Sequence, residues 1–303
     1  MILSASRRTD LPRWYSDWLL ARLRAGYALT RNPVVPSQIS RVPLTPDVVD
    51  CIVFWTKDPL PLLPKLSELD RMGYRYYFQF TLTPYGRDIE PGLRDKPAIE
   101  DTFLELSRAL GRERVLWRYD PILLNDTYTE AWHQAEFARM CGKLSPFTES
   151  VTISFLDLYA KLKSPLLRAP APDEIARLSR SCAETAGRYG LTIQACAEPG
   201  DLTSYGVKPA ACIDRDLIQR LCGHKMDLKP DKGQRPGCGC CESVDIGAYD
   251  TCKSGCVYCY ACYGRPLAAH DPSSGLLTGQ VREGEAVRER PCRSNILTQE
   301  SLW

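Results

Sequence analysis

The sequence predicts an α/β fold, namely a TIM-like (β/α) barrel that is complete or partial. Short β-rich runs alternate with helical runs at a spacing of roughly 40 residues over the first two thirds of the chain, as repeated βα units do. With 303 residues and an apolar fraction of 44%, the chain can bury one large core. We expect the barrel over residues 1–250. A cysteine-rich loop and an irregular tail over 251–303 would pack on it as part of a single domain.

The expected strands are short apolar or alternating runs. The run Cys51-Ile52-Val53-Phe54-Trp55 is continuously apolar, as in a strand buried on both faces. In the next strand Gln79, Thr81 and Thr83 alternate with apolar residues, so a polar row lies on one face. That row would line a ligand pocket inside a barrel or, alternatively, form a solvated face. The expected strands are residues 2–5, 48–55, 74–83, 114–119, 150–156, 191–197 and 243–248.

The expected helices follow these strands. Thr9 or Asp10 can cap the first helix, and Pro12 suits its first turn. Right-handed crossovers would wind the units into a closed or nearly closed parallel barrel. An open doubly wound sheet is the alternative, because strand order cannot be read from one sequence. The expected helices are residues 12–26, 60–72, 98–110, 128–142, 173–189 and 213–221.

The charge balance excludes some partners. The chain has 39 basic and 37 acidic residues and a net charge of +2, which gives no electrostatic case for bulk binding to nucleic acid or to anionic membranes. We find no apolar run of the length that spans a bilayer, and the apolar start of the chain is too short for a signal-peptide core. We therefore expect a cytoplasmic protein.

The cysteines are concentrated in the last third of the chain. Cys51, Cys141 and Cys182 are scattered in apolar contexts and are expected in the core, but eleven of the 14 cysteines lie from Cys196 onward. In a reducing compartment such clustering indicates metal. Cys252, Cys256 and Cys259 share one short loop. Three thiolates can hold three irons of a cubane cluster and leave the fourth iron open, whereas a structural zinc site normally has four protein ligands.

A second group of thiols indicates a second metal site. Cys238-Gly239-Cys240-Cys241 packs three thiols into four residues. Cys196 and Cys212 could complete four ligands with Cys238 and Cys240, and Cys222 is the main substitute. An auxiliary [4Fe-4S] cluster and a zinc ion held by four cysteines would look the same in sequence. We favour the cluster here, because the neighbouring loop already implies cluster assembly.

Charged residues recur where the expected strands end, which is where active sites of βα barrels lie. Arg7 and Arg8 could clamp a carboxylate or phosphate, since a guanidinium presents a planar fork of donors; alternatively one of them merely pairs with an aspartate. Lys57, Asp120 and Glu198 are candidates for contacts to substrate, ribose or amine groups. Together with Arg7 and Arg8 they are the candidate catalytic residues of this strand-end pocket. The cysteine loop follows the last expected strand and would join the same rim.

The motif Cys252-x3-Cys256-x2-Cys259, with Tyr258 before the last cysteine, resembles the radical S-adenosylmethionine superfamily. The resemblance implies a [4Fe-4S] cluster whose open iron chelates S-adenosylmethionine and cleaves it reductively to a 5′-deoxyadenosyl radical. That motif usually follows the first strand, so here the barrel would be circularly shifted. Because the superfamily's Gly-Gly-Glu motif does not follow strand one, Arg7, Arg8 or Thr9 would have to supply that contact to S-adenosylmethionine. Gln79, Thr81, Arg118 and Tyr258 are further candidates for binding the cofactor.

Almost the whole chain also resembles a bacterial family of unknown function, DUF1848, through Ser4-Ala5-Ser6-Arg7-Arg8-Thr9-Asp10, Phe54-Trp55-Thr56-Lys57, Trp117-Arg118-Tyr119-Asp120-Pro121 and Asp245-Ile246-Gly247-Ala248-Tyr249 among other segments. The leading hypothesis is a radical S-adenosylmethionine-type enzyme with a small-molecule substrate and a reductant such as flavodoxin or ferredoxin. A non-catalytic iron–sulfur or zinc protein, acting in redox or partner interaction, is the alternative. A minor alternative is action on nucleic acid, because a DNA-repairing member of the superfamily has a similar loop; near-neutral charge argues against it.

Overall fold

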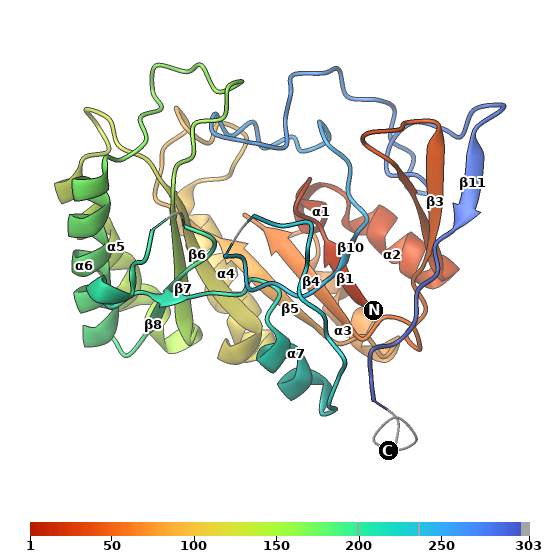
Figure 1. Cartoon of the computed structure of the whole chain (residues 1–303), viewed down its shortest axis with the longest axis horizontal. Coiled ribbons are helices and arrows are strands. Elements are labelled where there is room, and N and C mark those ends of the chain that lie inside the picture. Colours follow the sequence, from red (N-terminus) through yellow and green to blue (C-terminus); the bar gives the residue numbers. More distant parts are fainter. Residues whose placement is uncertain (199, 236, 298–303) are drawn as a thin grey trace.

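The computed structural model describes residues 1–198, 200–235 and 237–297. Its centre is an eight-stranded sheet of order β10-β1-β4-β5-β6-β7-β8-β9 (Figure 1). Every pair of neighbouring strands is parallel. The strands are β1 (Ile2–Ala5), β4 (Cys51–Thr56), β5 (Tyr76–Thr81), β6 (Val115–Ile122), β7 (Ser150–Phe155), β8 (Thr192–Ala195), β9 (Lys208–Pro209) and β10 (Val244–Asp245).

The strand order confirms the βα-repeat interpretation of the sequence. From β1 to β9 each strand lies beside the previous strand of the sheet. β10, the last strand of this sheet along the chain, pairs with β1. That pairing is what a circularly shifted barrel requires. Within the described residues β9 and β10 are the two edges of the sheet, and closure of a barrel is not observed.

Five of the six expected helices start and end within about two residues of their expected positions. The helix expected over 60–72 is α-helical only over Leu66–Arg71, because Pro61 and Pro64 interrupt the segment before it. The first expected helix is broken at Tyr15, whose backbone leaves the helical region. The following helix ends at Gly26, which has φ 74° and so takes the left-handed conformation that glycine tolerates. The helices are α1 (Leu11–Trp14), α2 (Ser16–Ala25), α3 (Leu66–Arg71), α4 (Lys96–Leu110), α5 (Glu130–Leu144), α6 (Pro172–Arg188) and α7 (Arg215–Cys222).

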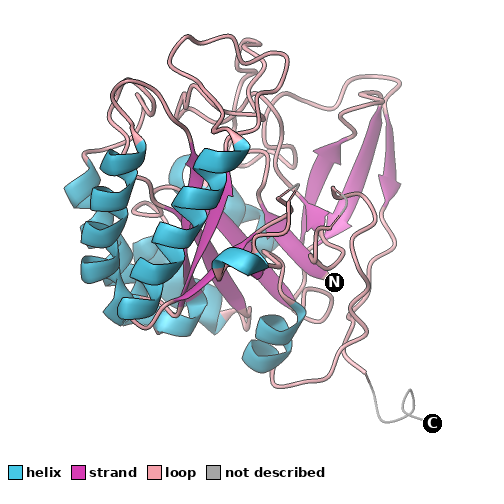
Figure 2. Ribbon diagram, turned by 60° about the vertical axis from the view of Figure 1, so that its left-hand side comes forward, coloured by secondary structure: helices cyan, strands magenta, loops and turns pink. Residues whose placement is uncertain are grey.

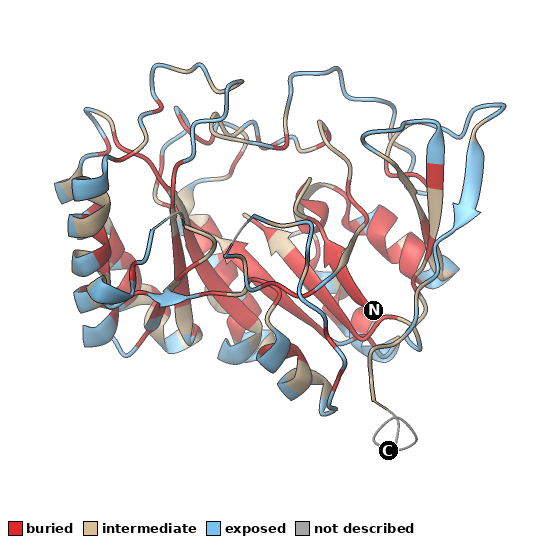
Figure 3. Ribbon diagram, viewed as in Figure 1, coloured by how far each residue is buried: buried red, intermediate tan, exposed pale blue. Residues whose placement is uncertain are grey.

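Because successive side chains of a strand point to opposite sides, the sheet has two different faces. Ile52 and Phe54 of β4 join the large core beneath helices α2 to α6, which cover the outer face of the sheet (Figure 2). Cys51 and Val53 of the same strand point to the opposite face, where they meet α7 and the segment around Cys212. The strands themselves are largely buried (Figure 3). The inner face is therefore covered by the chain between β9 and β10.

A second, three-stranded sheet lies beside the barrel and was not expected from the sequence. β2 (Tyr27–Arg31) and β3 (Gln38–Pro43) form an antiparallel hairpin, and β11 (Ala286–Glu289) pairs parallel with β3. The expectation of an irregular tail is therefore wrong for residues 286–289. β11 is fully exposed and carries charged side chains, so its sequence lacks the apolar pattern of a buried strand (Figure 3). Within the described part of the chain, no helix is both long and apolar enough to cross a membrane.

Candidate functional site

The cysteine loop, residues 246–262, follows β10 and lies at the carboxyl ends of the parallel strands. Its backbone is fixed to the segment after β5, because Val257 donates to the carbonyl of Ile89 at 3.0 Å and Gly92 donates to that of Ser254 at 2.9 Å. A Cβ atom on Gly92 would lie only 2.6 Å from a loop carbonyl oxygen. Glycine is therefore required for this close approach. The loop thus joins the rim where strand ends converge.

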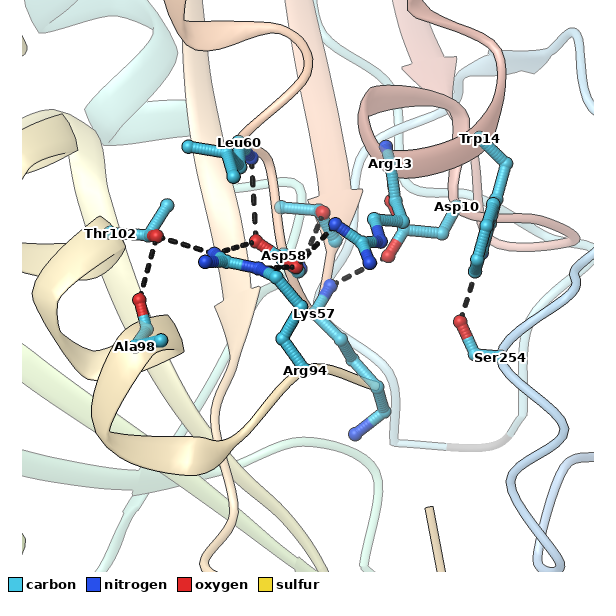
Figure 4. A network of polar contacts seen from close by, with 11 residues as sticks. Asp10, Arg13, Trp14, Lys57, Asp58, Leu60, Arg94, Ala98, Thr102 and Ser254 are labelled. Carbon is cyan, nitrogen blue, oxygen red and sulfur yellow. Dashed lines mark hydrogen bonds and ion pairs between the residues drawn. The ribbon is translucent and has the colours of Figure 1, made fainter. Parts of the chain in front are cut away.

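A buried polar network supports the loop from the side of α1 (Figure 4). The carboxylate of Asp58 is fully buried and pairs with Arg13 at 2.6 Å and with Arg94 through two contacts of 2.7 Å. The adjacent Trp14 donates its indole N–H to the Ser254 hydroxyl at 3.0 Å. Figure 4 shows that Asp58 joins helix α1 to the segment before α4, so both supports of the loop are held together.

Glu90 is a buried charge at the centre of the loop contact. Its carboxylate accepts hydrogen bonds from Lys57 at 2.7 Å, from Thr83 at 3.0 Å, and from Lys96 and Tyr258. Burial alone would raise the pKa of Glu90, but the two ammonium groups hold it at about 2. The Tyr258 hydroxyl therefore donates to a carboxylate that stays ionised at neutral pH. Its predicted role in cofactor binding is not tested by this contact.

The cysteine loop carries the three thiols of the predicted cluster motif. Cys252, Cys256 and Cys259 are half-buried, and their sulfurs do not all lie within 4.8 Å of one another. A cubane cluster places each thiolate on a different iron, so it needs wider spacing than a single ion. This wider spacing is compatible with the predicted [4Fe-4S] cluster. A hydrogen bond with the Cys262 thiol lowers the pKa of Cys259 to about 6. Cys262, which sequence reasoning left unassigned, is thus a fourth thiol at this loop.

The second predicted cysteine group is assembled on the inner face of the sheet. The sulfurs of Cys196, Cys238 and Cys240 all lie within 4.8 Å of one another. The Cys212 thiol interacts with those of Cys196 and Cys240, but its sulfur lies outside the set that is mutually within 4.8 Å. The substitute ligand, Cys222, is placed elsewhere, because its thiol contacts the carbonyl of Asp50 at 3.3 Å and the thiol of Cys51. Residues far apart in sequence thus bring four thiols together.

Two arginines face this second group across Trp55. Arg118 donates to the Cys212 sulfur at 2.8 Å and pairs with Asp120, which also accepts from Ser154. The guanidinium carbons of Arg7 and Arg118 lie 5.3 and 5.4 Å from the Trp55 ring centroid. These are cation–π distances. Two guanidinium groups, each paired with a carboxylate, therefore lie where the thiols gather.

The other predicted site residues are spread along the rim. Arg8 contacts the carbonyl of Gly247 at 3.5 Å and stacks over Tyr249. The hydroxyl of Thr9 is buried without a partner among the described residues. Gln79 donates to the carbonyl of Cys212 at 2.7 Å, and Thr81 is half-buried at the end of β5. Glu198 accepts from the amide of Phe155, and burial raises its pKa to about 7.

Sequence reasoning missed Asp245, which ends β10. Its carboxylate accepts from the hydroxyls of Ser4 at 2.9 Å and Ser6 at 2.6 Å, and from the amides of Arg7 at 2.8 Å and Gly247 at 2.9 Å. It therefore fixes the turn after β1 against the start of the cysteine loop. Its position within an expected strand, two residues before a glycine, could have marked Asp245 as a candidate. Its partners become visible only in the pairing of β10 with β1.

The fold and the grouped thiols define a parallel βα protein with a cysteine-lined candidate metal site at one rim of its sheet. The chain belongs to the family described as "Domain of unknown function (DUF1848)", whose profile matches residues 2–261. This range includes the predicted metal ligands of both groups, whereas Cys262 lies just beyond it. It confirms the family resemblance seen in the sequence.

No curated protein matches the sequence. Among solved structures, the chain is similar to a protein from Bacteroides thetaiotaomicron that is provisionally described as an alpha-L-fucosidase. The identity is 10%, the match covers 69% of this chain and 80% of that one, and the TM-score is 0.29. No conclusion about activity follows from a likeness at this level.

Proposed function

We propose that the protein is a radical S-adenosylmethionine-type enzyme whose cluster is held by Cys252, Cys256 and Cys259. The observation that carries the proposal is the place of the cysteine loop. It follows a strand that pairs with β1, so it occupies the position after the first strand of a circularly shifted barrel. Active sites of βα barrels are built at this end of the strands.

The surrounding side chains suit a cluster of this kind. Lys57 lies near Cys256, and although burial works against its ammonium group, the Glu90 carboxylate and then the Cys256 thiol raise its pKa. A positive charge beside a thiolate ligand stabilises the ligated form. Lys161 donates to the carbonyls of Tyr260 at 2.5 Å and Cys262 at 2.8 Å and so fixes the end of the loop. A bound cluster would supply one electron to S-adenosylmethionine, whose bond between sulfur and C5′ then breaks to give methionine and a 5′-deoxyadenosyl radical.

The rim offers groups for the cofactor and the substrate. Arg8 and Thr9 lie on the turn that Asp245 fixes beside the loop, so they are the proposed contacts to the carboxylate and amine of S-adenosylmethionine. Arg118, Gln79 and Arg7 lie deeper, against the second cysteine group, and Thr81, Asp120 and Glu198 line the rim between them. We propose a small-molecule substrate bound among these groups. Flavodoxin or ferredoxin would supply the electron.

The test is reductive cleavage of S-adenosylmethionine. The full chain is reconstituted with iron and sulfide without oxygen, reduced with dithionite, and assayed by chromatography for 5′-deoxyadenosine and methionine in equal amounts. The expected result is product from the unaltered chain and none from Cys256→Ala. Cys292→Ala is the matched control, because this thiol lies outside both groups. A reconstituted, reduced protein that neither binds nor cleaves S-adenosylmethionine overturns the enzyme proposal.

One observation favours a second candidate, a non-catalytic metal site. The contact of Cys262 with Cys259 provides four thiols on a single loop, and four thiolates can close a zinc site or saturate an iron–sulfur cluster. In that case the cysteine loop would organise a surface for redox or partner interaction. Iron and sulfide analysis of the reconstituted chain separates the zinc form from the cluster form. The cleavage assay separates a closed cluster from an open one.

A further inference from the structure

The second cysteine group has a spacing that fits one metal ion. Three of its sulfurs, from Cys196, Cys238 and Cys240, are mutually within 4.8 Å. A single zinc ion with bonds of about 2.3 Å in tetrahedral geometry holds its sulfur ligands about 3.8 Å apart. The thiolates of a cubane cluster are held farther apart, because each is bonded to a different iron. The compact spacing therefore distinguishes this group from the cysteine loop.

Cys212 is the neighbouring fourth thiol. Its sulfur interacts with those of Cys196 and Cys240 but lies outside the set that is mutually within 4.8 Å, so a shift of its side chain would bring it onto a shared ion. Its backbone is fixed as well, because its carbonyl accepts from Tyr77 at 2.8 Å and from Gln79 at 2.7 Å. Four thiols meet the ligand number that closed structural zinc sites have.

N–H groups surround the sulfurs as they do around thiolate ligands. Arg118 donates to the Cys212 sulfur at 2.8 Å, and the amide of Ile213 donates to the Cys240 sulfur at 3.4 Å. Arg7 faces Cys240 and Cys212, and its buried Nη2 has no partner among the described residues. Donors in this outer layer orient the ligands and stabilise the bound metal. The two guanidinium groups also lie beside the charge of −2 that four thiolates and one divalent ion would carry, and each pairs in addition with a carboxylate.

The four cysteines join the two ends of one connection. Cys196 follows β8 and Cys212 follows β9, whereas Cys238 and Cys240 precede β10. β9 and β10 are the unpaired edges of the sheet, and the chain between them crosses its inner face (Figure 1). An ion held by all four would tie this crossing segment to the sheet at the place where a closed barrel would have strand pairing.

We propose that Cys196, Cys212, Cys238 and Cys240 bind a single structural zinc ion, which fastens the connection between β9 and β10 across the open side of the barrel. This site is independent of the proposed activity of the cysteine loop. If the zinc assignment is wrong, the proposal for the cysteine loop is unaffected. If the cysteine loop has no such activity, the zinc assignment is likewise unaffected.

The direct experiment needs no substitution. The full-length protein, purified without oxygen, is analysed for metals and then by X-ray absorption at the zinc edge. The expected result is one zinc per chain with four sulfur neighbours at about 2.3 Å. Zinc bound through nitrogen or oxygen, or no stoichiometric zinc, overturns the assignment.

Substitutions then locate the ion. Cys238 is half-exposed on the connecting segment, so Cys238→Ser removes a ligand with little disturbance of the core. This variant is expected to lose the zinc. The matched control is Cys241→Ser, because that thiol lies next to Cys240 in sequence but hydrogen-bonds with Arg215 instead. It should keep one zinc per chain. Equal loss in both variants, or retention in both, overturns the ligand assignment.

A third variant tests the cluster alternative. In Cys252→Ala/Cys256→Ala/Cys259→Ala the cysteine loop cannot hold a cluster, so any remaining metal belongs elsewhere. We expect a colourless protein with one zinc and no acid-labile sulfide after reconstitution with iron and sulfide. A brown protein with four irons and four sulfides, lost on the further change Cys238→Ser, would show an auxiliary cluster and refute the zinc proposal.

Discussion

Replacing Glu90 by glutamine is expected to destabilise the protein strongly, because the change leaves two buried ammonium groups without a counter-charge. The Glu90 side chain is fully buried between Lys57 and Lys96. The pKa of Glu90 is lowered from 4.5 to about 2, which at 1.36 kcal/mol per pH unit corresponds to about 3 kcal/mol of stability at neutral pH. This figure agrees with the loss of about 3–5 kcal/mol that follows removal of one partner from a buried ion pair.

The measurement is urea-induced unfolding at pH 7, followed by tryptophan fluorescence on samples with matched metal content. Glu90→Gln is expected to lower the free energy of unfolding by about 3 kcal/mol, with the cost falling on the buried lysines. A Lys57→Met/Glu90→Gln variant removes one of the uncompensated charges and should recover part of the loss. Glu68→Gln is the control, because the partner of Glu68, Arg24, is largely exposed and surface pairs contribute little.

The pH dependence gives a second check with a defined sign. The folded-state pKa of Glu90 lies below its unfolded value, so its contribution is complete above pH 4.5 and is lost as the pH falls toward 2. The difference between the unaltered protein and Glu90→Gln should therefore shrink across that interval. A loss at pH 7 of under about 1 kcal/mol, or one equal to that of Glu68→Gln, would refute the reasoning.

Three further changes test other parts of the structure. Gly92→Ala inserts a methyl group 2.6 Å from a carbonyl oxygen of the cysteine loop. Such overpacking should lower the free energy of unfolding by about 1–3 kcal/mol and should reduce iron incorporation. Gly187→Ala is the control, because its added methyl group has no neighbour within 4 Å, and it should change neither quantity. Cys262→Ala should retain the cluster and the cleavage of S-adenosylmethionine; loss of both would instead indicate a closed site. His133 is buried, which lowers its pKa to about 4, below the unfolded value of about 6.5, so the protein should lose up to about 3 kcal/mol as the pH falls from 6.5 to 4. His133→Gln should lack that part of the slope, and an unchanged slope in urea unfolding would contradict the assignment.

The repeat of strands and helices was visible in the sequence because buried strands and amphipathic helices have different apolar periods. Cys51 to Phe54 form a strand as expected, and the polar residue Gln79 lies on the inner face together with Arg118. The small sheet was missed because the prediction depended on apolar periods. β11 has no apolar period, and only its pairing with β3 makes it a strand.

The two cysteine groups also differ in how much of their arrangement the sequence predicts. The spacing Cys252-x3-Cys256-x2-Cys259 is local, so one loop can present three ligands whatever the fold around it, and the sequence alone indicated a cluster-type site. The role of Glu90 could not be predicted from its neighbours in sequence, because its partners come from the ends of two strands, the start of α4 and the cysteine loop. Its role depends on contacts across more than 160 residues of chain.

The sequence by itself determined the family, the βα repeat and the grouping of the thiols into two sets. Tertiary structure decided how those sets differ. Cys196, Cys212, Cys238 and Cys240 lie on three separate segments, and their sulfur spacing depends on where β8, β9 and β10 end in space. Whether a set of thiols suits one ion or a cluster depends on distances of a few ångströms between such segments, and a linear order of residues does not carry that information.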